Sequence, residues 1–377
     1  MRRFALCVLL SLIACSDDAS GPGSGDATST ASIAIPPNYG IHDTFVRDGL
    51  AFVSAWNSGL LIYDVGNGIK NGSPSAPRLV STIVTADRGV PGGAQVHNAW
   101  WFHDPSGSRR YVFVGQEGPG VIGRSATGDI HVVDVTDLEH PVEVAFYSLA
   151  GAGTHNFWVD EAAQVLYAAY YNGGVAALDV SGTLSGDLSS REIARVLPGG
   201  QSYVWGVQAE GGSVYATDML SGLWQLQLAG NRFLVAGGGA NVPARFTSDL
   251  WVRGGYVYTG TWGQRGEVGN AVNVWQLDPQ GAPVLVDSVV TDNITTVSDV
   301  EVSPDGSLLL FSSENGPRAG LRFYRLTNPA SPRFVSDYLV PGGVHTATFA
   351  LIGGRLYVFA AKNPPEPALL IIDVTDL

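Results

Sequence analysis

Four histidines stand at the start of short apolar runs, and their type and context are the first sign of chemistry in this sequence. The runs read "IHDTFV", "VHNAWWF", "GTHNFWV" and "VHTATF", and the histidines are His42, His97, His155 and His345. Imidazole binds Zn, Cu, Fe and Ni, and nearby carboxylates complete such sites or orient the ring nitrogens. Whether the four side chains share one ion depends on the fold that carries them.

The composition limits the classes of protein to consider. The chain has 377 residues, of which 45% are hydrophobic, and it contains 48 glycines. Such a chain buries a sizeable core, so disorder is excluded for most of its length. Its formal net charge of −13 argues against a nucleic-acid partner, because phosphate backbones attract basic surfaces.

The N-terminus has the pattern of an export signal. A basic start, "MRR", precedes an apolar segment that is too short to span a bilayer and ends in "LIAC" at Cys15. This ending resembles the lipobox of bacterial lipoproteins. The resemblance implies a signal peptide over residues 1–14, lipid on Cys15, and anchoring of an extracytoplasmic protein in the outer membrane or at the cell surface. The alternative is an ordinary secretory signal cut after Ala14 or later.

A flexible tether is expected behind the anchor, over residues 15–32, because "SDDASGPGSGDATSTA" has no apolar periodicity. The sequence holds two cysteines, Cys7 in the signal peptide and Cys15 at its end. The remaining domain therefore has no thiol for a disulfide or a metal.

The histidine runs belong to an internal repeat. Each opens a pattern of three short strands separated by Gly, Asp or Asn turns, and a fourth strand follows most copies. Seven copies start at intervals of 43 to 58 residues, at the anchor residues His42, His97, His155, Trp205, Ser248, Ser298 and His345. Four antiparallel strands in about 45 residues make a propeller blade. The sequence thus predicts an all-β, seven-bladed β-propeller over residues 33–377, which a pair of β-sandwiches would not reproduce.

The last blade lacks a fourth strand of its own, because the chain stops at "LLIIDVTDL". A spare strand exists at the other end, where "ASIAIPPNYGIHD" parallels "PRFVSDYLVPGGVHT". We therefore expect Ile33–Ile35 to supply the outer strand of blade 7 and to remove an exposed sheet edge.

Three phrases, "HVVDVTDLEHPVEV", "LIIDVTDL" and "YRLTNPASPRFV", resemble the LVIVD-repeat family of bacterial surface propellers. The resemblance covers nearly all of residues 33–377 and implies the repeat type but no activity. Two copies depart from the pattern, since "QLQLAG" has no Asp-Val and "WQLDPQGAPVLV" holds only the Asp.

In a propeller the innermost strands begin beside the central channel, so the seven anchors should ring one mouth. The four histidines come from blades 7, 1, 2 and 3, which are consecutive around the ring. The ends of the second strands reach the same face. These ends contribute the further candidates Trp56, Gln116, Glu117, Tyr170, Tyr171, Asp218, Trp262 and Glu314.

Three interpretations of the histidines stand side by side. They bind a transition metal such as Zn, Cu or Fe; they each bond a turn residue of their own blade; or they contact a ligand directly. Possible turn partners are Asn57, Asn172, Asn315 and Asn363. The aromatic residues at the turn tips can also stack on sugar rings.

The sequence favours a binding or scaffold module of the cell envelope that acts through the histidine-bearing face. Its partner is an envelope protein, a glycan or a small molecule, and not a nucleic acid. The alternative is a metal-dependent extracytoplasmic enzyme, with an oxidoreductase favoured over a hydrolase. A carbohydrate-binding module is the third hypothesis, because fold alone does not assign a function.

Overall fold

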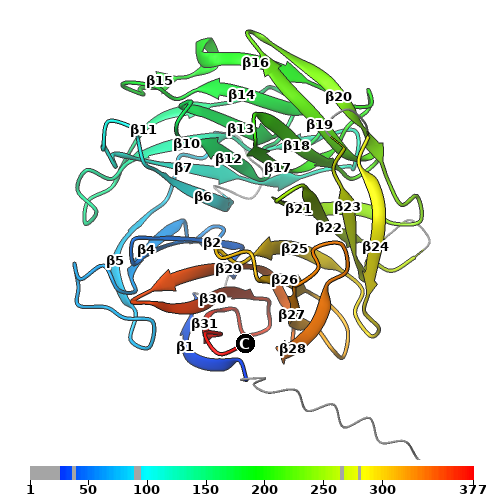
Figure 1. Cartoon of the computed structure of the whole chain (residues 1–377). Coiled ribbons are helices and arrows are strands. Elements are labelled where there is room, and N and C mark those ends of the chain that lie inside the picture. Colours follow the sequence, from blue (N-terminus) through cyan, green and yellow to red (C-terminus); the bar gives the residue numbers. More distant parts are fainter. Residues whose placement is uncertain (1–25, 36–39, 89–94, 264–266, 279–281) are drawn as a thin grey trace, which may run out of the picture.

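Seven four-stranded antiparallel sheets surround a central channel like the blades of a propeller (Figure 1). The structure is a computed structural model and describes residues 26–35, 40–88, 95–263, 267–278 and 282–377. It confirms the predicted all-β, seven-bladed fold. The predicted signal peptide, the lipidation site Cys15 and the first part of the tether, to residue 25, lie outside the described residues.

The strands of each blade follow one another from the channel outward. Blade 1 holds β2 (Asp43–Arg47), β3 (Leu50–Ser54), β4 (Leu60–Asp64) and β5 (Arg78–Ile83). Blade 2 holds β6 (Val96–Phe102), β7 (Tyr111–Gln116), β10 (Ile130–Asp134) and β11 (Val142–Tyr147). Blade 3 holds β12 (Phe157–Asp160), β13 (Val165–Ala169), β14 (Val175–Asp179) and β16 (Glu192–Val196). Blade 4 holds β17 (Val204–Glu210), β18 (Ser213–Asp218), β19 (Gly222–Ala229) and β20 (Arg232–Ala240).

The remaining blades repeat this order. Blade 5 holds β21 (Phe246–Arg253), β22 (Tyr256–Trp262), β23 (Ala271–Gln276) and β24 (Val284–Val290). Blade 6 holds β25 (Val297–Val302), β26 (Leu308–Ser313), β27 (Gly320–Arg325) and β28 (Arg333–Leu339). Blade 7 holds β29 (Val344–Ile352), β30 (Arg355–Lys362), β31 (Ala368–Asp373) and, as its outer strand, β1 (Thr28–Ala34).

Few elements lie outside this plan. A short strand, β15 (Gly186–Asp187), adds to β11 in parallel, and β8 (Gly118–Pro119) pairs with β9 (Ala126–Thr127). One turn of 3-10 helix, η1, covers Ser189–Arg191. Within the described part of the chain, no helix has the length and apolar character needed to cross a bilayer.

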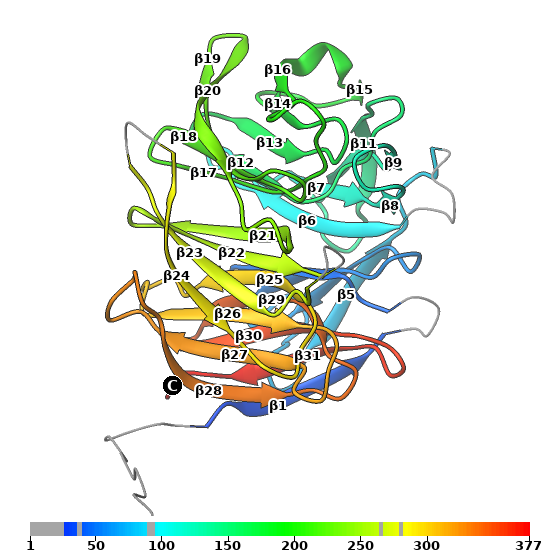
Figure 2. The same cartoon turned by 90° about the vertical axis from the view of Figure 1, so that its right-hand side faces the viewer.

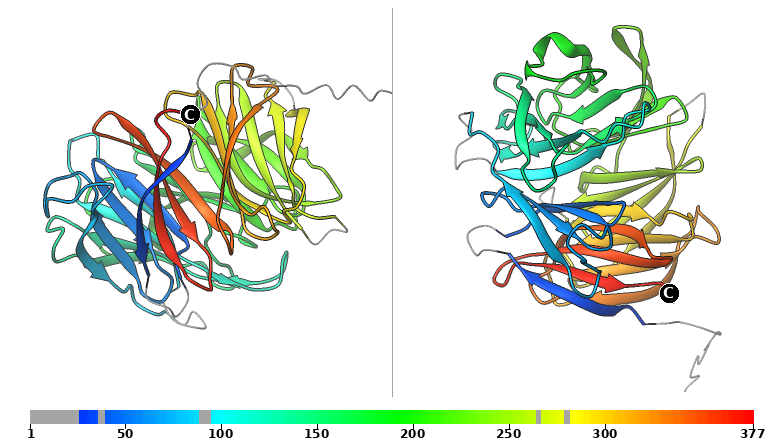
Figure 3. Two further views of the ribbon diagram at one scale, coloured as in Figure 1. Left: turned by 90° about the horizontal axis from the view of Figure 1, so that it is seen from below. Right: turned by 90° about the vertical axis from the view of Figure 1, so that its left-hand side faces the viewer.

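The ring is closed by contacts between neighbouring inner strands. Each of β2, β6, β12, β17, β21, β25 and β29 contacts the next one, and β29 returns to β2. Figures 2 and 3 show the blades from the sides and from below.

The N-terminal strand completes blade 7, as predicted. β1 pairs antiparallel with β31 and lies beside it at the rim in Figure 1. The strand is longer than expected, because it begins at Thr28 and not at Ile33. Residues 28–32 therefore belong to the propeller and not to the tether, since their backbone pairs with β31 although their composition is polar.

The second and third strands of each blade are largely buried on both sides because each blade packs between two others, whereas outer strands such as β5 and β24 are exposed or half-buried. In β3, Leu50 and Phe52 join a cluster with blade 2, whereas Ala51 and Val53 join a cluster with blade 7. Successive side chains of a strand point to opposite faces, so two covered faces require a continuous apolar run. The rigid stack that results holds the inner strands, and hence the anchors, in place.

Candidate metal centre at one mouth of the channel

A local irregularity of the inner strands presents the anchor residues to the channel mouth. In blades 2, 4, 5, 6 and 7 the pairing with the second strand shifts register at the anchor. Such a bulge places two residues opposite one and turns the strand locally. The anchor therefore faces the mouth while the residue after it, such as Asn98 or Asp249, lines the channel below.

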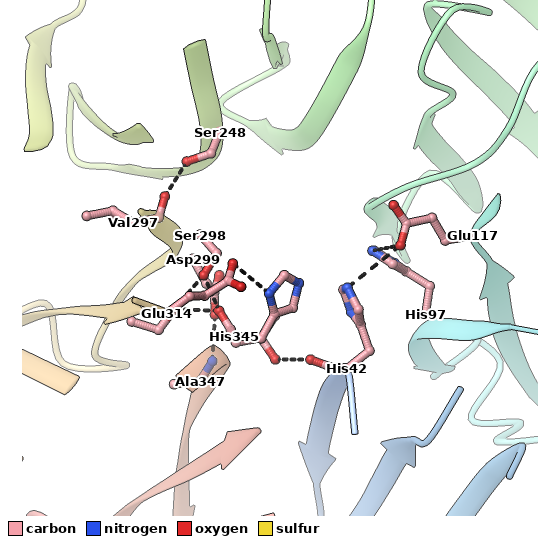
Figure 4. A network of polar contacts seen from close by, with 12 residues as sticks. His42, His97, Glu117, Ser248, Val297, Ser298, Asp299, Glu314, His345 and Ala347 are labelled. Atoms are coloured by element: carbon pink, nitrogen blue, oxygen red, sulfur yellow. Dashed lines mark hydrogen bonds and ion pairs between the residues drawn. The ribbon is translucent and has the colours of Figure 1, made fainter. Parts of the chain in front are cut away.

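All four histidines meet at this mouth. The ring centroids lie 4.1 Å apart for His345 and His42, 3.8 Å for His42 and His97, and 4.2 Å for His97 and His155. Figure 4 shows three of these rings with the two carboxylates nearest to them. The sequence-based expectation that the histidines form one arc agrees with this geometry.

Three ligand atoms converge in the middle of the arc, from His42, His97 and Glu117. The Nε2 atoms of His42 and His97 lie 3.8 Å and 3.7 Å from Oε2 of Glu117. One ligand atom from each of the three lies within 4.8 Å of the other two, so the group could hold a metal ion. This set contains two of the four predicted histidines, joined by a carboxylate from the end of β7.

The electrostatics of the group suit a metal. Burial and the neighbouring imidazoles hold the pKa of His42 and His97 well below the ordinary value, so both rings are neutral and able to ligate. Both nitrogens of His97 and Nδ1 of His42 are buried without a hydrogen-bond partner among the described residues. Burial also raises the pKa of Glu117 to about 7. Unpaired buried polar atoms are costly, and a cation bound between them would remove that cost.

The outer histidines of the arc already have partners. His345 and Glu314 form a close pair, with 2.8 Å between Nδ1 and Oε1. Burial opposes protonation of His345, but the Glu314 carboxylate outweighs it and raises the pKa of the ring. At the other end, Nδ1 of His155 donates to the carbonyl of Trp205 at 2.7 Å, and burial lowers the pKa of His155 to about 3.

These partners bear on one of the three interpretations, in which each histidine bonds a turn residue of its own blade. Instead, His155 bonds the backbone of blade 4 and His345 bonds the end of the second strand of blade 6. The amide of Asn172 donates to the carbonyls of Gly151 at 2.7 Å and Arg124 at 3.4 Å, so it joins its turn to two other loops.

The other candidates divide into two groups. Those at the mouth pack on the arc: Trp56 lies 4.7 Å from His42, Trp205 lies 4.3 Å from His155, and Trp262 lies 5.1 Å from Trp205, all between ring centroids. Tyr171 donates its hydroxyl hydrogen to Glu117 and fixes the orientation of that carboxylate.

Two candidates have structural partners and do not join the arc. The hydroxyl of Tyr170 donates to the carbonyl of Gly128 at 3.1 Å. The carboxylate of Asp218 accepts the backbone N–H groups of Tyr203 at 2.5 Å and Ser221 at 2.7 Å, and so holds a turn.

The sequence analysis missed a layer of polar and aromatic residues below the anchors. It includes Asp43, Asp249, Asp299 and Glu301, together with three tryptophans, and all of them line a cavity in the channel. The signal was present, because these residues follow the anchors by one or three positions, which is the spacing of a channel-facing side of a strand.

No family model and no curated protein matches this chain. Solved structures do resemble it. A chain of the structure titled "Crystal Structure of Mitotic Checkpoint Complex" matches over 100% of both chains, with a TM-score of 0.67 and 14% identity. The WD40 β-propeller domain of Doa1 matches over 92% of this chain and 96% of its own, with a TM-score of 0.61 and 9% identity. A computationally designed protein, Ika8, matches over 89% and 84%, with a TM-score of 0.56 and 9% identity. At such identities the likeness shows the fold alone: this chain is a seven-bladed β-propeller with the architecture of WD40 propellers.

Proposed function

We propose that the protein is a metal-dependent binding module, which captures its ligand at the mouth of the propeller through an ion held by His42, His97 and Glu117. One observation carries the proposal. Two buried, neutral imidazoles with unpartnered nitrogens face a buried carboxylate at 3.7 and 3.8 Å. A site that served only stability would pair these atoms with one another or with the backbone.

The donor set indicates the class of metal. Imidazole and carboxylate suit Zn, Cu and Fe, and the described residues include no cysteine. Three protein ligands leave a coordination position for a donor atom of the ligand, for example a carboxylate or an amine. The rings of Trp56 and Trp205 flank the arc and supply apolar contacts around that position.

We further propose that the module works at the cell envelope, anchored by lipid on Cys15, as a propeller of the LVIVD-repeat kind. The support is the "LIAC" motif and the repeat phrases. Its ligand would be an envelope protein, a glycan or a small molecule. Replacement of Cys15 by Ser should move the protein from the membrane fraction to the soluble fraction; unchanged membrane association would contradict the anchor.

A second candidate function is a metal-dependent enzyme. The observation in its favour is the number of ligands, because catalytic zinc sites keep three protein ligands and an open position. The two functions differ in turnover. An enzyme would change a bound substrate chemically, whereas a binding module would release it unaltered.

The metal itself is the point to test. We expect the protein, purified without a His-tag, to contain close to one equivalent of Zn, Cu or Fe by elemental analysis. His97→Ala should lower the affinity for that metal more than about 100-fold, because loss of a direct ligand exceeds the loss of an outer partner. His140→Ala is the matched control, since His140 is exposed and its ring pairs with Asp137 in its own turn. A protein that binds none of these metals, before or after reconstitution, would overturn the proposal.

A further inference from the structure

The central channel contains a cavity of about 270 Å³ directly below the histidine arc. Its lining comes from the inner strands, and its acidic residues and tryptophans lie at the first or third position after the anchors. One part of the lining is acidic and another is aromatic. We call them the acidic wall (Asp43, Asp249, Asp299 and Glu301) and the aromatic wall (Phe45, Trp100, Trp158 and Trp251).

The acidic wall has no positive counterpart in the cavity. No Lys, Arg or His of the described residues is among those that line it. His345 interacts electrostatically with Asp43 and Asp299, but its ring is already bonded to Glu314. Burial raises the pKa of Asp249 to about 6, and it raises the pKa of Asp299 and Glu301 as well. Carboxylates in such a position resist ionisation unless a cation joins them.

The carboxylates are held in place by hydrogen bonds from other blades. Asp299 accepts the N–H of Ala347 at 2.7 Å, and Glu301 accepts the N–H of Phe349 at 3.0 Å. Asp249 accepts a hydrogen bond from the side chain of Asn156 at 2.9 Å. These bonds fix the acidic wall before any ligand arrives.

The aromatic wall is a continuous row of rings. Ring centroids lie 5.1 Å apart for Phe45 and Trp100, 5.0 Å for Trp100 and Trp158, and 6.0 Å for Trp158 and Trp251. The indole N–H of Trp100 donates to Glu161 at 3.2 Å, which fixes the first of the three indoles. Tryptophan faces attract cations more strongly than other side-chain rings.

Two further groups in the lining indicate that something is to be bound. Thr44 and Asn98 are 3% and 4% exposed, and both line the cavity. The hydroxyl of Thr44 and Oδ1 of Asn98 have no hydrogen-bond partner among the described residues. Buried polar atoms normally have a hydrogen-bond partner, so a bound molecule would supply the missing donor or acceptor here.

A metal ion fits this cavity poorly. Calcium takes six to eight oxygen ligands at about 2.3–2.6 Å, which requires carboxylates that converge on one point. Within the described residues, the only three His, Cys, Asp or Glu side chains whose ligand atoms come within 4.8 Å of one another are those at the mouth. Asp249 and Asp299 bond each other, but no three carboxylates of the acidic wall converge on one point, so the wall suits a larger cation better than a metal ion.

We propose that the channel binds a small organic cation, an amine or a quaternary ammonium compound, between the aromatic wall and the acidic wall. The aromatic faces surround the substituents of the nitrogen and the carboxylates neutralise its charge. Entry is from the mouth opposite the histidines. There a wider hollow of about 830 Å³ shares Phe45, Trp100 and Trp158 with the cavity. This site is separate from the metal centre, so each can exist without the other.

The test uses the full chain and three probes in calorimetric titrations: choline, putrescine, and the uncharged carbon analogue of choline with a tert-butyl group in place of trimethylammonium. We expect choline or putrescine to bind with a dissociation constant below about 1 mM and to change the tryptophan fluorescence. The uncharged analogue should bind at least about tenfold more weakly, because it lacks the attraction to the rings and carboxylates. Equal binding of the analogue, or no binding of either cation, would overturn the proposal.

Variants locate the site. Trp158→Leu and Asp299→Asn should each weaken the cation about tenfold or more. The controls are Trp224→Leu in blade 4 and the exposed Asp292→Asn, which lie outside the cavity lining and should bind as the wild type does. Circular dichroism and Tm show whether each variant is folded, and two independent variants keep the test valid if one of them unfolds. Wild-type affinity in both cavity variants would place the cation elsewhere and refute the proposal.

Discussion

The two halves of the anchor ring use the same strand position in different ways. In blades 5 and 6 the anchors are serines, and each bonds the next blade: Ser248 donates to the carbonyl of Val297 at 2.6 Å, and Ser298 to that of His345 at 2.5 Å. In blades 1 and 2 the anchors are His42 and His97. There the buried nitrogens Nδ1 of His42 and Nδ1 and Nε2 of His97 have no hydrogen-bond partner among the described residues.

This difference shows that the anchor position can link neighbouring blades without a histidine. A serine at the anchor links neighbouring blades, and Thr346, one position after an anchor, does the same by donating to the carbonyl of His42 at 2.5 Å. His155 and His345 share features of both groups. Each has one hydrogen-bonded ring nitrogen, as the serines have a bonded hydroxyl, and each lies next to the unpaired rings of His42 and His97. The propeller therefore does not need histidines at blades 1 and 2, and their presence there supports the proposed metal site.

The largest loss of stability is expected from removing β1, which opens the ring at blade 7, next to the histidine-bearing blades. β1 pairs with β31 along its whole length, and the hydroxyl of Thr30 donates to the carbonyl of Ile371 at 2.9 Å. A chain that starts at Ile35 should lose several kcal/mol of unfolding free energy relative to one that starts at Asp26. That loss approaches the total stability of a domain, and it leaves an exposed sheet edge.

Thermal melts and hydrogen exchange check this prediction. Amides of blades 7 and 1 should exchange faster in the shorter chain than amides of blades 4 and 5, and the metal should be lost together with the order of the arc. Equal melting temperatures for the two chains would show that pairing of β1 with β31 does not stabilise the propeller.

An intermediate loss of stability is expected when the His345–Glu314 pair is broken. This change tests whether His345 stabilises the fold, in contrast to the proposed ligands His42 and His97. Burial alone would raise the pKa of Glu314, but the charge and hydrogen bond of His345 lower it below the ordinary 4.5. A lowered carboxyl pKa stabilises the fold above about pH 4.5, and the contribution disappears as the pH falls through the folded-state pKa. The raised pKa of His345 acts in the opposite sense: its contribution is complete below about 6.5 and disappears as the pH rises through the folded-state value.

Glu314→Gln should therefore lower the unfolding free energy by about 2–3 kcal/mol near pH 6, since it breaks a largely buried pair. The difference from the wild type should shrink in acid and again at alkaline pH. Glu139→Gln is the control, because its pair with Lys70 is exposed and surface pairs contribute at most about 1 kcal/mol. Denaturant unfolding as a function of pH measures both. A loss that does not vary with pH would contradict the assigned ion pair.

Sequence periodicity was enough to predict the blades, because the second and third strands of each blade are largely buried on two sides and so appear as continuous apolar runs. The meeting of His42, His97, His155 and His345 followed from the same repeat, since equivalent positions in consecutive blades must lie side by side. Glu117 could be named as a candidate for the same reason, as the end of a second strand.

The partners of these residues could not be predicted. His155 bonds a carbonyl of the next blade, and a repeat pattern says nothing about contacts between copies. The start of β1 at Thr28 was missed because "TSTAS" has the composition of a linker, and only its pairing with β31 makes it a strand. Cys15 and the proposed anchor remain a prediction from the sequence, since that segment lies outside the described residues.

The smallest expected effect comes from replacing single anchor residues. It compares the serine and histidine halves of the anchor ring directly, because the two replacements should change stability in opposite directions. Ser248→Ala removes the donor to Val297 in a fully buried place and should cost about 1 kcal/mol of unfolding free energy. His97→Leu, in metal-free protein, replaces two unpaired buried nitrogens by an apolar group and should be neutral or stabilising. Denaturant titrations of both variants after chelation measure the difference. With metal restored, the wild type should become more stable than His97→Leu, because the ion stabilises the wild type and not the variant. If His97→Leu instead destabilises the metal-free protein as much as Ser248→Ala does, the histidine is a structural anchor like the serine, and the metal centre loses its main support.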